Sequence, residues 1–133
     1  MKIFVCIDKS GGMLFNNRRL SQDSIVRQKM LEITGSSKLY LNSYSAKQFE
    51  SSDKLIIDDN FLTTAAENDF CFIENLPVPD NADEYYIFNW NRDYPADTYF
   101  SLDPKAPGFK KVKSENFTGS SHKKITLEIY SKI

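Results

Sequence analysis

The sequence predicts a single α/β domain over residues 1–133: a mostly parallel sheet flanked by helices in three layers, with an antiparallel C-terminal edge. Three observations support this prediction. A chain of 133 residues has the length of one domain. Up to Glu74, short apolar runs alternate with helix signals, which is typical of βαβ units with right-handed crossovers. After Pro79 come three strand-like runs with no helix between them, as expected of antiparallel strands added at one edge.

Four parallel strands are expected in the first part of the chain. They are KIFVCI at 2–7, KLYLN at 38–42, KLIID at 54–58 and DFCFIE at 69–74. All four are rich in branched and aromatic side chains, which favour strands. Their nearly continuous apolar character indicates a sheet that is covered on both faces.

One long helix and two short ones are expected between these strands. The long helix has Ser21 or Asp23 as its N-cap, apolar residues at helical spacing, and Gly35 where a chain leaves a helix. The short helices are expected at 45–50 and 60–67.

The β-rich end contains the runs EYYIFNW at 84–90, FKKVK at 109–113 and KITLEIY at 124–130. Side chains alternate between the two faces of a strand. Tyr86, Phe88 and Trp90 therefore share one face and are expected to fill the core. Tyr85 and Ile87 point the other way, and should cover either a helix or a second subunit.

Composition restricts the classes of function. A net charge of −1 gives no general attraction to nucleic acid or to an anionic membrane. The longest apolar run, 3–7, is too short for a signal or membrane segment, so we expect a cytoplasmic protein with no membrane partner. Cys6 and Cys71 lie in apolar runs and should be buried free thiols. Because His122 is the only histidine, no metal site is expected.

The segment GGMLFNNRRLSQD at 11–23 joins the first strand to the long helix and has two interpretations. It is either a loop that closes over a ligand or an ordinary connection whose polar residues cap the helix. Gly11 and Gly12 are expected to supply the positive φ angles that a closing loop needs.

Three stretches of the chain resemble the dihydrofolate reductase family in a shortened form. VCIDKSGGM, followed by LSQD and ITG, resembles the family's first strand, mobile loop and first helix. DEYYIFNWNRDYPADTYF at 83–100 resembles a second family segment, and the ending FTGSSHKKITLEIYSKI is similar to the family's last strand. The resemblance implies the family's fold, with a ligand cleft at the carboxyl ends of the parallel strands.

The resemblance also implies roles for individual residues. Asp23 falls where the family has the acid that holds the aminopyrimidine end of a pterin, and is the candidate catalytic residue; its alternative role is a helix N-terminal carboxylate. Asp97 matches the acid that hydrogen-bonds the mobile loop. The remaining candidate ligand-binding residues are Met13, Leu14 and Phe15 of that loop, together with Tyr44 and Ser45.

Departures from the family pattern imply that the nicotinamide cofactor is lost. Ser43 stands where the family has a phosphate-binding arginine. Glu74 places a negative charge where the family has a Gly-Gly turn that receives the pyrophosphate. Phe88 replaces the threonine that supports the catalytic carboxylate. We therefore expect no cofactor and no reductase activity, but binding of a small molecule or a protein partner, with a homodimer as one arrangement.

Two alternative functions remain open. The first is an active NADPH-dependent pterin-type reductase with an altered cofactor site. The second is a nucleic-acid-binding or nuclease-like protein. It would use basic clusters around Arg18 and Lys110 and metal-binding carboxylates at Asp8, Asp58 and Asp59. In GSSHKK, catalysis by Ser121 and His122 is not expected, because neighbours in a strand point apart and no acid lies near them in sequence.

Overall fold

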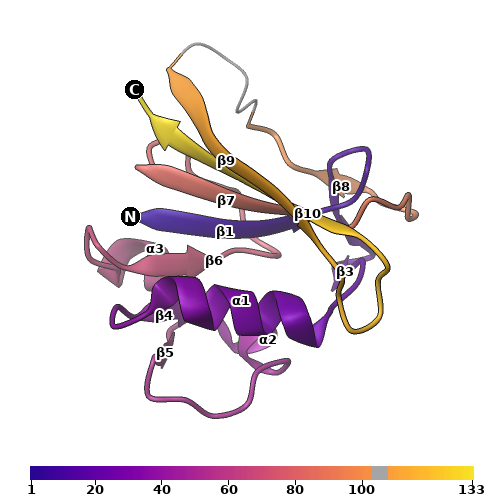
Figure 1. The fold of residues 1–133 in the computed structure, drawn as a ribbon. Helices are drawn as coiled ribbons and strands as arrows, with labels where there is room; N and C mark the ends of the chain where they lie inside the picture. Colours follow the sequence, from indigo (N-terminus) through magenta and orange to yellow (C-terminus); the bar gives the residue numbers. More distant parts are fainter. Residues whose placement is uncertain (103–107) are drawn as a thin grey trace.

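The computed structural model describes residues 1–102 and 108–133. A seven-stranded sheet in the order β5-β4-β6-β1-β7-β10-β9 runs through the molecule (Figure 1). Its strands are β1 (Lys2–Ile7), β4 (Leu39–Leu41), β5 (Leu55–Ile57), β6 (Phe70–Phe72), β7 (Glu84–Asn89), β9 (Phe109–Phe117) and β10 (Ile125–Lys132). The pairs among β5, β4, β6, β1 and β7 are parallel, whereas β10 is antiparallel to both β7 and β9. The predicted fold class is therefore confirmed.

Helices cover both faces of this sheet. α1 (Ser24–Thr34) begins after Asp23, whose side chain accepts a hydrogen bond from the Ile25 N–H, and ends at Gly35 with a φ of 58°. α2 (Ser43–Ala46) and α3 (Phe61–Thr64) are single turns. The predicted ranges 45–50 and 60–67 were wrong in their bounds. α2 begins two residues earlier than expected, with Asn42 as its N-cap. α3 ends at Thr64, because the backbone of Ala65 is extended.

Residues 12–19, expected to belong either to a closing loop or to an ordinary connection, form a hairpin. β2 (Gly12–Phe15) pairs with both β3 (Arg18–Arg19) and β8 (Thr98–Tyr99), giving a second, three-stranded sheet. The turn uses Asn16 and Asn17 at φ 51° and 60°, the left-handed conformations that a tight hairpin of this kind requires. Strand pairing on both sides of β2 explains why this segment is ordered structure.

The two glycines before the hairpin differ in their roles. Gly11 has a φ of 87°, as predicted. The prediction was wrong for Gly12, which has no positive φ but needs to be small. A Cβ there would lie 2.7 Å from Ala96 Cβ and 3.1 Å from Asp8 Oδ1.

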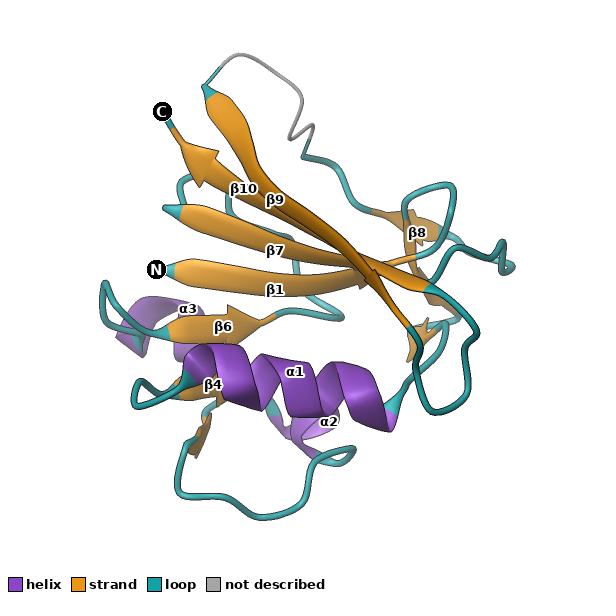
Figure 2. Cartoon of the chain, viewed as in Figure 1, coloured by secondary structure: helices purple, strands orange, loops and turns teal. Residues whose placement is uncertain are grey.

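Each face of the large sheet has its own core. Tyr86, Phe88 and Trp90 pack with Val26 and Met30 of α1, as their alternation predicted. On the opposite face, Tyr85 and Ile87 are buried against a cluster that includes Phe61 of α3. α1 and α3 thus lie on opposite faces of the sheet (Figure 2). The chain itself covers Tyr85 and Ile87, so a second subunit is not needed there.

The structure also bears on the thiols and on membrane insertion. Both cysteines are free thiols; Cys71 is buried and Cys6 is partly buried. Across the described residues, every helix is too short or too polar to cross a membrane.

Candidate functional site

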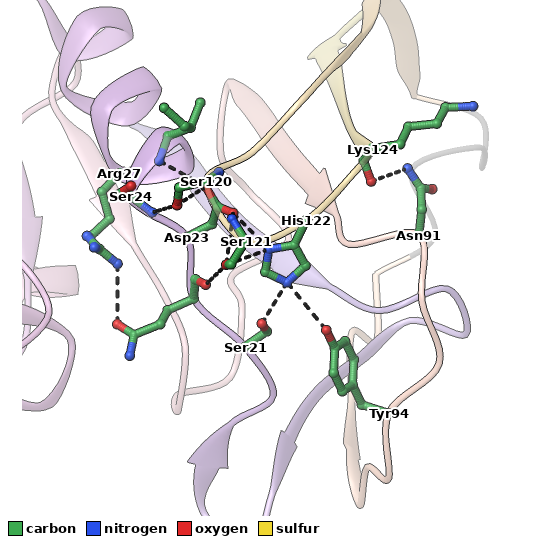
Figure 3. Close-up of polar contacts among 12 residues, drawn as sticks. Ser21, Asp23, Ser24, Arg27, Asn91, Tyr94, Ser120, Ser121, His122 and Lys124 are labelled. Carbon is green, nitrogen blue, oxygen red and sulfur yellow. Dashed lines mark hydrogen bonds and ion pairs between the residues drawn. The ribbon is translucent and has the colours of Figure 1, made fainter.

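The Asp23 carboxylate is surrounded by hydrogen-bond donors from the chain itself (Figure 3). Oδ1 accepts from the backbone N–H groups of Ile25 and Ser120, each at 2.9 Å. Oδ2 accepts from the Ser121 N–H at 2.9 Å and lies 2.8 Å from His122 Nδ1. The loop between β9 and β10 thus closes over the N-terminus of α1, with the Asp23 side chain fully buried between them.

These contacts hold Asp23 in its ionised form. Burial by itself would raise the pKa of the Asp23 carboxyl. The hydrogen bond with the His122 side chain, and those from the backbone of Ser121, Ser120 and Ile25, outweigh burial and place the pKa well below its usual range. Asp23 is therefore a buried anion whose charge is satisfied internally.

The second ring nitrogen of His122, Nε2, contacts two hydroxyl groups. Nε2 lies 2.8 Å from Ser21 Oγ and 3.3 Å from the Tyr94 hydroxyl oxygen. The imidazole ring stacks on Trp90, with 4.6 Å between ring centroids and 24° between planes. The sequence reasoning missed this arrangement, because the acid that contacts His122 lies 99 residues away along the chain.

Almost no space is left beside Asp23. The cavity there has a volume of about 10 Å³, barely that of one water molecule. Its lining includes Cys6, Ser21, Asp23 and Trp90. Asp23 thus occupies the place that the resemblance predicted, but its carboxylate faces protein donors and no ligand-sized space.

Glu74 lies at the carboxyl end of the parallel sheet and is neutralised by Arg19. Arg19 Nε and Nη2 donate to the two Glu74 carboxylate oxygens at 2.9 and 3.2 Å, in a two-pronged ion pair. Gln48 Nε2 donates to the same carboxylate at 3.0 Å. The expectation that Glu74 makes this place negative therefore needs correction, because its charge is paired within the protein.

Tyr44 and Ser45 of α2 also make internal contacts. The Tyr44 hydroxyl accepts from the Arg19 N–H at 2.8 Å, and the Arg19 guanidinium lies 4.4 Å from the centre of the Tyr44 ring. Ser45 is fully buried, and its Oγ is the one buried side-chain polar atom without a hydrogen-bond partner among the described residues. Tyr44 thus supports the Arg19–Glu74 pair.

A protein carboxylate occupies the N-terminus of α2. Ser43 donates from its backbone N–H to Asp59 Oδ1 at 2.9 Å and from its hydroxyl to Asp59 Oδ2 at 3.3 Å. These hydrogen bonds from Ser43 lower the pKa of Asp59. In the family pattern, the turn that corresponds to the start of α2 binds a cofactor phosphate. In this chain the Asp59 carboxylate accepts the hydrogen bonds of that turn instead.

A larger cleft lies on the other side of Glu74, beneath the hairpin. Its volume is about 340 Å³, and Met13 and Leu14 line it together with the segment that follows β6. The complete lining is Met13, Leu14, Asn17, Glu74, Asn75, Leu76, Pro77, Val78, Thr98, Tyr99 and Ser101. Phe15, the third apolar residue of the predicted loop, is 42% exposed at the hairpin turn and does not line the cleft.

Two carboxylates fasten the hairpin. Asp97 Oδ2 accepts from the Asn16 N–H at 3.0 Å, and the Asp97 N–H donates to the Leu14 carbonyl oxygen at 2.9 Å. Asp8, which sequence reasoning considered only as a metal ligand, is buried and accepts from the backbone of Ser10, Gly12 and Tyr94. Within the described ranges, no group of three or more histidine, cysteine or acidic residues is placed to hold a metal ion.

Comparison with solved structures places this fold in a known class. The chain is similar to the dihydrofolate reductase from Enterococcus faecalis complexed with NADP(H) and RAB-propyl, with a TM-score of 0.67. The alignment covers 98% of this chain and 95% of that chain, at 11% sequence identity. No protein-family model and no curated protein matches the chain. The chain therefore has a dihydrofolate reductase-like fold, and its function is inferred from its own residues.

Proposed function

We propose that this chain is a ligand-binding protein built on the dihydrofolate reductase-like fold, without folate reductase activity. The proposal depends on one observation, that the Asp23 carboxylate is buried and hydrogen-bonded within the protein. This carboxylate is fully buried and engaged by His122 and three backbone N–H groups, beside a cavity of about 10 Å³. A pterin ring needs both a free carboxylate and a cavity many times larger.

The start of α2 and the cleft beneath the hairpin do not fit a nicotinamide dinucleotide. Phosphate binding needs backbone N–H groups or cations that face open space. Asp59 takes the donors at the start of α2, and Arg19 is committed to Glu74. The lining of the 340 Å³ cleft contains one acid and no lysine or arginine. These contacts support a protein that uses no such cofactor.

The cleft beneath the hairpin suits a small, uncharged and partly apolar molecule. Its volume lies at the lower end of the range for small-molecule sites. Met13, Leu14, Leu76 and Val78 offer an apolar surface, while Asn17, Asn75 and Thr98 offer polar groups at its border. Met13 and Leu14 keep their predicted role in this proposal, at a different place from Asp23.

NADPH and dihydrofolate are expected to leave the melting temperature unchanged at saturating concentrations. Asp23 offers no free carboxylate to a pterin, and neither the start of α2 nor the cleft beneath the hairpin offers free donors or cations to a phosphate. Neither molecule is therefore expected to stabilise the folded state by mass action. Differential scanning fluorimetry measures the shift, and absorbance at the NADPH wavelength measures turnover. A shift of several degrees with NADPH, or a steady loss of NADPH absorbance with dihydrofolate, contradicts the proposal and favours the reductase alternative.

Neutral aromatic fragments are expected to bind in the cleft beneath the hairpin. In ¹H–¹⁵N NMR spectra, the chemical shifts they cause should cluster at Leu14, Asn75 and Thr98. Thr98→Trp, at an exposed position on the cleft border, should abolish these shifts by filling the space. Thr63→Trp is the matched control, because Thr63 is an exposed residue of α3 that does not line the cleft. This variant should still show the fragment-induced shifts. Fragment shifts confined to other surfaces refute this location.

A further inference from the structure

Ser21, His122 and Asp23 form a linear chain of contacts that the proposed ligand cleft does not use (Figure 3). Ser21 Oγ lies 2.8 Å from His122 Nε2, and His122 Nδ1 lies 2.8 Å from Asp23 Oδ2. Ser21 and Asp23 come from the segment that enters α1, and His122 comes from the loop before β10. A nucleophile, a base and an acid that orients the base require this order and these distances.

The hydrogen bonds around His122 fix the role of each ring nitrogen. Asp23 is an anion and only accepts, so Nδ1 carries a proton and donates to it. In the neutral ring, Nε2 then presents a lone pair toward Ser21 Oγ. Stacking on Trp90 holds the ring plane in place. His122 is therefore oriented to take the proton of the Ser21 hydroxyl.

Two further features favour chemistry at Ser21. Ser21 is only partly buried, in contrast to Asp23 and His122. Within the described part of the chain, the backbone N–H of the next residue, Gln22, has no internal acceptor. In many hydrolases the N–H that follows the nucleophile stabilises the developing oxyanion.

A basic groove adjoins this group at Trp90 and Ser121. Its volume is about 480 Å³, and it is lined by Trp90, Asn91, Arg92, Ser121, Lys123 and Lys124. Three cations and no acid line it, so it favours a negatively charged molecule. Trp90 lines both this groove and the small cavity beside Ser21.

We propose that Ser21 is a nucleophile toward small carboxylic esters that carry a negative charge. Its Oγ bonds to the ester carbonyl carbon while its proton passes to His122 Nε2. The ester C–O bond then breaks, and His122 returns the proton to the leaving alcohol. Water, deprotonated by the same nitrogen, hydrolyses the acyl-serine and restores the free hydroxyl. Asp23 is the positioning residue that keeps His122 in the active tautomer.

Covalent labelling tests the nucleophile directly. A fluorophosphonate probe is expected to modify the full chain at Ser21, as located by mass spectrometry of the labelled peptide. Ser21→Ala should abolish this label, whereas the exposed Ser24→Ala, three residues further on, should retain it. Far-UV circular dichroism confirms that both variants are folded. Absence of label at Ser21 in the folded wild-type protein, or equal labelling of Ser21→Ala, overturns the proposal.

Ester hydrolysis tests the substrate class. After subtraction of the rates without protein, the wild-type protein is expected to hydrolyse mono-p-nitrophenyl succinate faster than the uncharged p-nitrophenyl acetate. The subtraction is needed because the succinate carboxylate attacks its own ester. Ser21→Ala should reduce the rate with the succinate ester by about 10³-fold or more, as seen when a triad nucleophile is removed. Ser24→Ala, at an exposed serine whose hydroxyl does not contact His122, should retain the activity. Equal rates with the two esters, or unchanged rates in Ser21→Ala, contradict the proposal.

Discussion

Asp23→Ala is expected to lower the free energy of unfolding by about 3–5 kcal/mol, which is a large part of the stability of a domain this size. The substitution removes the acceptor shared by His122 and by the N–H groups of Ile25, Ser120 and Ser121. These donors were arranged around a fully buried anion and have no equivalent acceptor nearby. Urea denaturation at pH 7, followed by tryptophan fluorescence, measures the difference.

The pH dependence separates the loss of the anion from the loss of side-chain volume. Because the folded-state pKa of Asp23 is lowered, its contribution to stability is present above the ordinary carboxyl pKa of about 4. It is lost as pH falls toward the folded-state pKa. The difference between wild-type and Asp23→Ala should therefore shrink steadily below about pH 4.

The control substitution is Asp97→Ala, at an exposed carboxylate with a single backbone donor from Asn16, which should cost about 1 kcal/mol or less. Equal losses for Asp23→Ala and Asp97→Ala at pH 7 would contradict the role assigned to Asp23.

Most of the fold was predictable because its main strands are marked by local patterns. The continuous apolar runs identified the parallel strands, and alternation at Tyr86, Phe88 and Trp90 identified the face that packs against α1. The hairpin at 12–19 was not predicted, although Asn16 and Asn17 are a recognised signal for such a turn. The resemblance implied a mobile loop at the same place, and the alternative was an ordinary connection between strand and helix.

The candidate site was predictable only in part, because its contacts join distant segments of the chain. The start of the long helix located Asp23, and Glu74 stood out as a charge in place of glycine. Their partners, His122 and Arg19, lie 99 and 55 residues away in sequence. No local pattern specifies such pairs. The sequence thus identified both carboxylates, with Asp23 as either a ligand-binding residue or a helix N-terminal carboxylate and Glu74 as a charge that opposes a pyrophosphate. It did not identify the protein groups that donate to them.

Gly119→Ala is expected to destabilise the protein by about 2–4 kcal/mol, although the change adds only a methyl group. A Cβ at residue 119 would lie 2.7 Å from Ile125 Cδ1 and 2.8 Å from Asp23 Cγ. Ile125 is fully buried, and the Asp23 carboxylate is held by donors on both oxygens, so neither side chain has room to withdraw. Thermal and urea denaturation measure the loss.

A double-mutant cycle identifies the cause of that loss. If the added methyl acts by displacing the Asp23 carboxylate, Gly119→Ala should cost clearly less in an Asp23→Ala background than in the wild type. Ser120→Ala is the matched control. It removes one hydroxyl contact to Asp23, at 3.2 Å, and one exposed acceptor of the Ser24 N–H, at 3.1 Å, and should cost about 1 kcal/mol or less. Additive effects of the Gly119 and Asp23 substitutions would show that the strain arises elsewhere, for instance at Ile125. A strong coupling would show that the β9–β10 loop fits Asp23 so closely that glycine is required at this position.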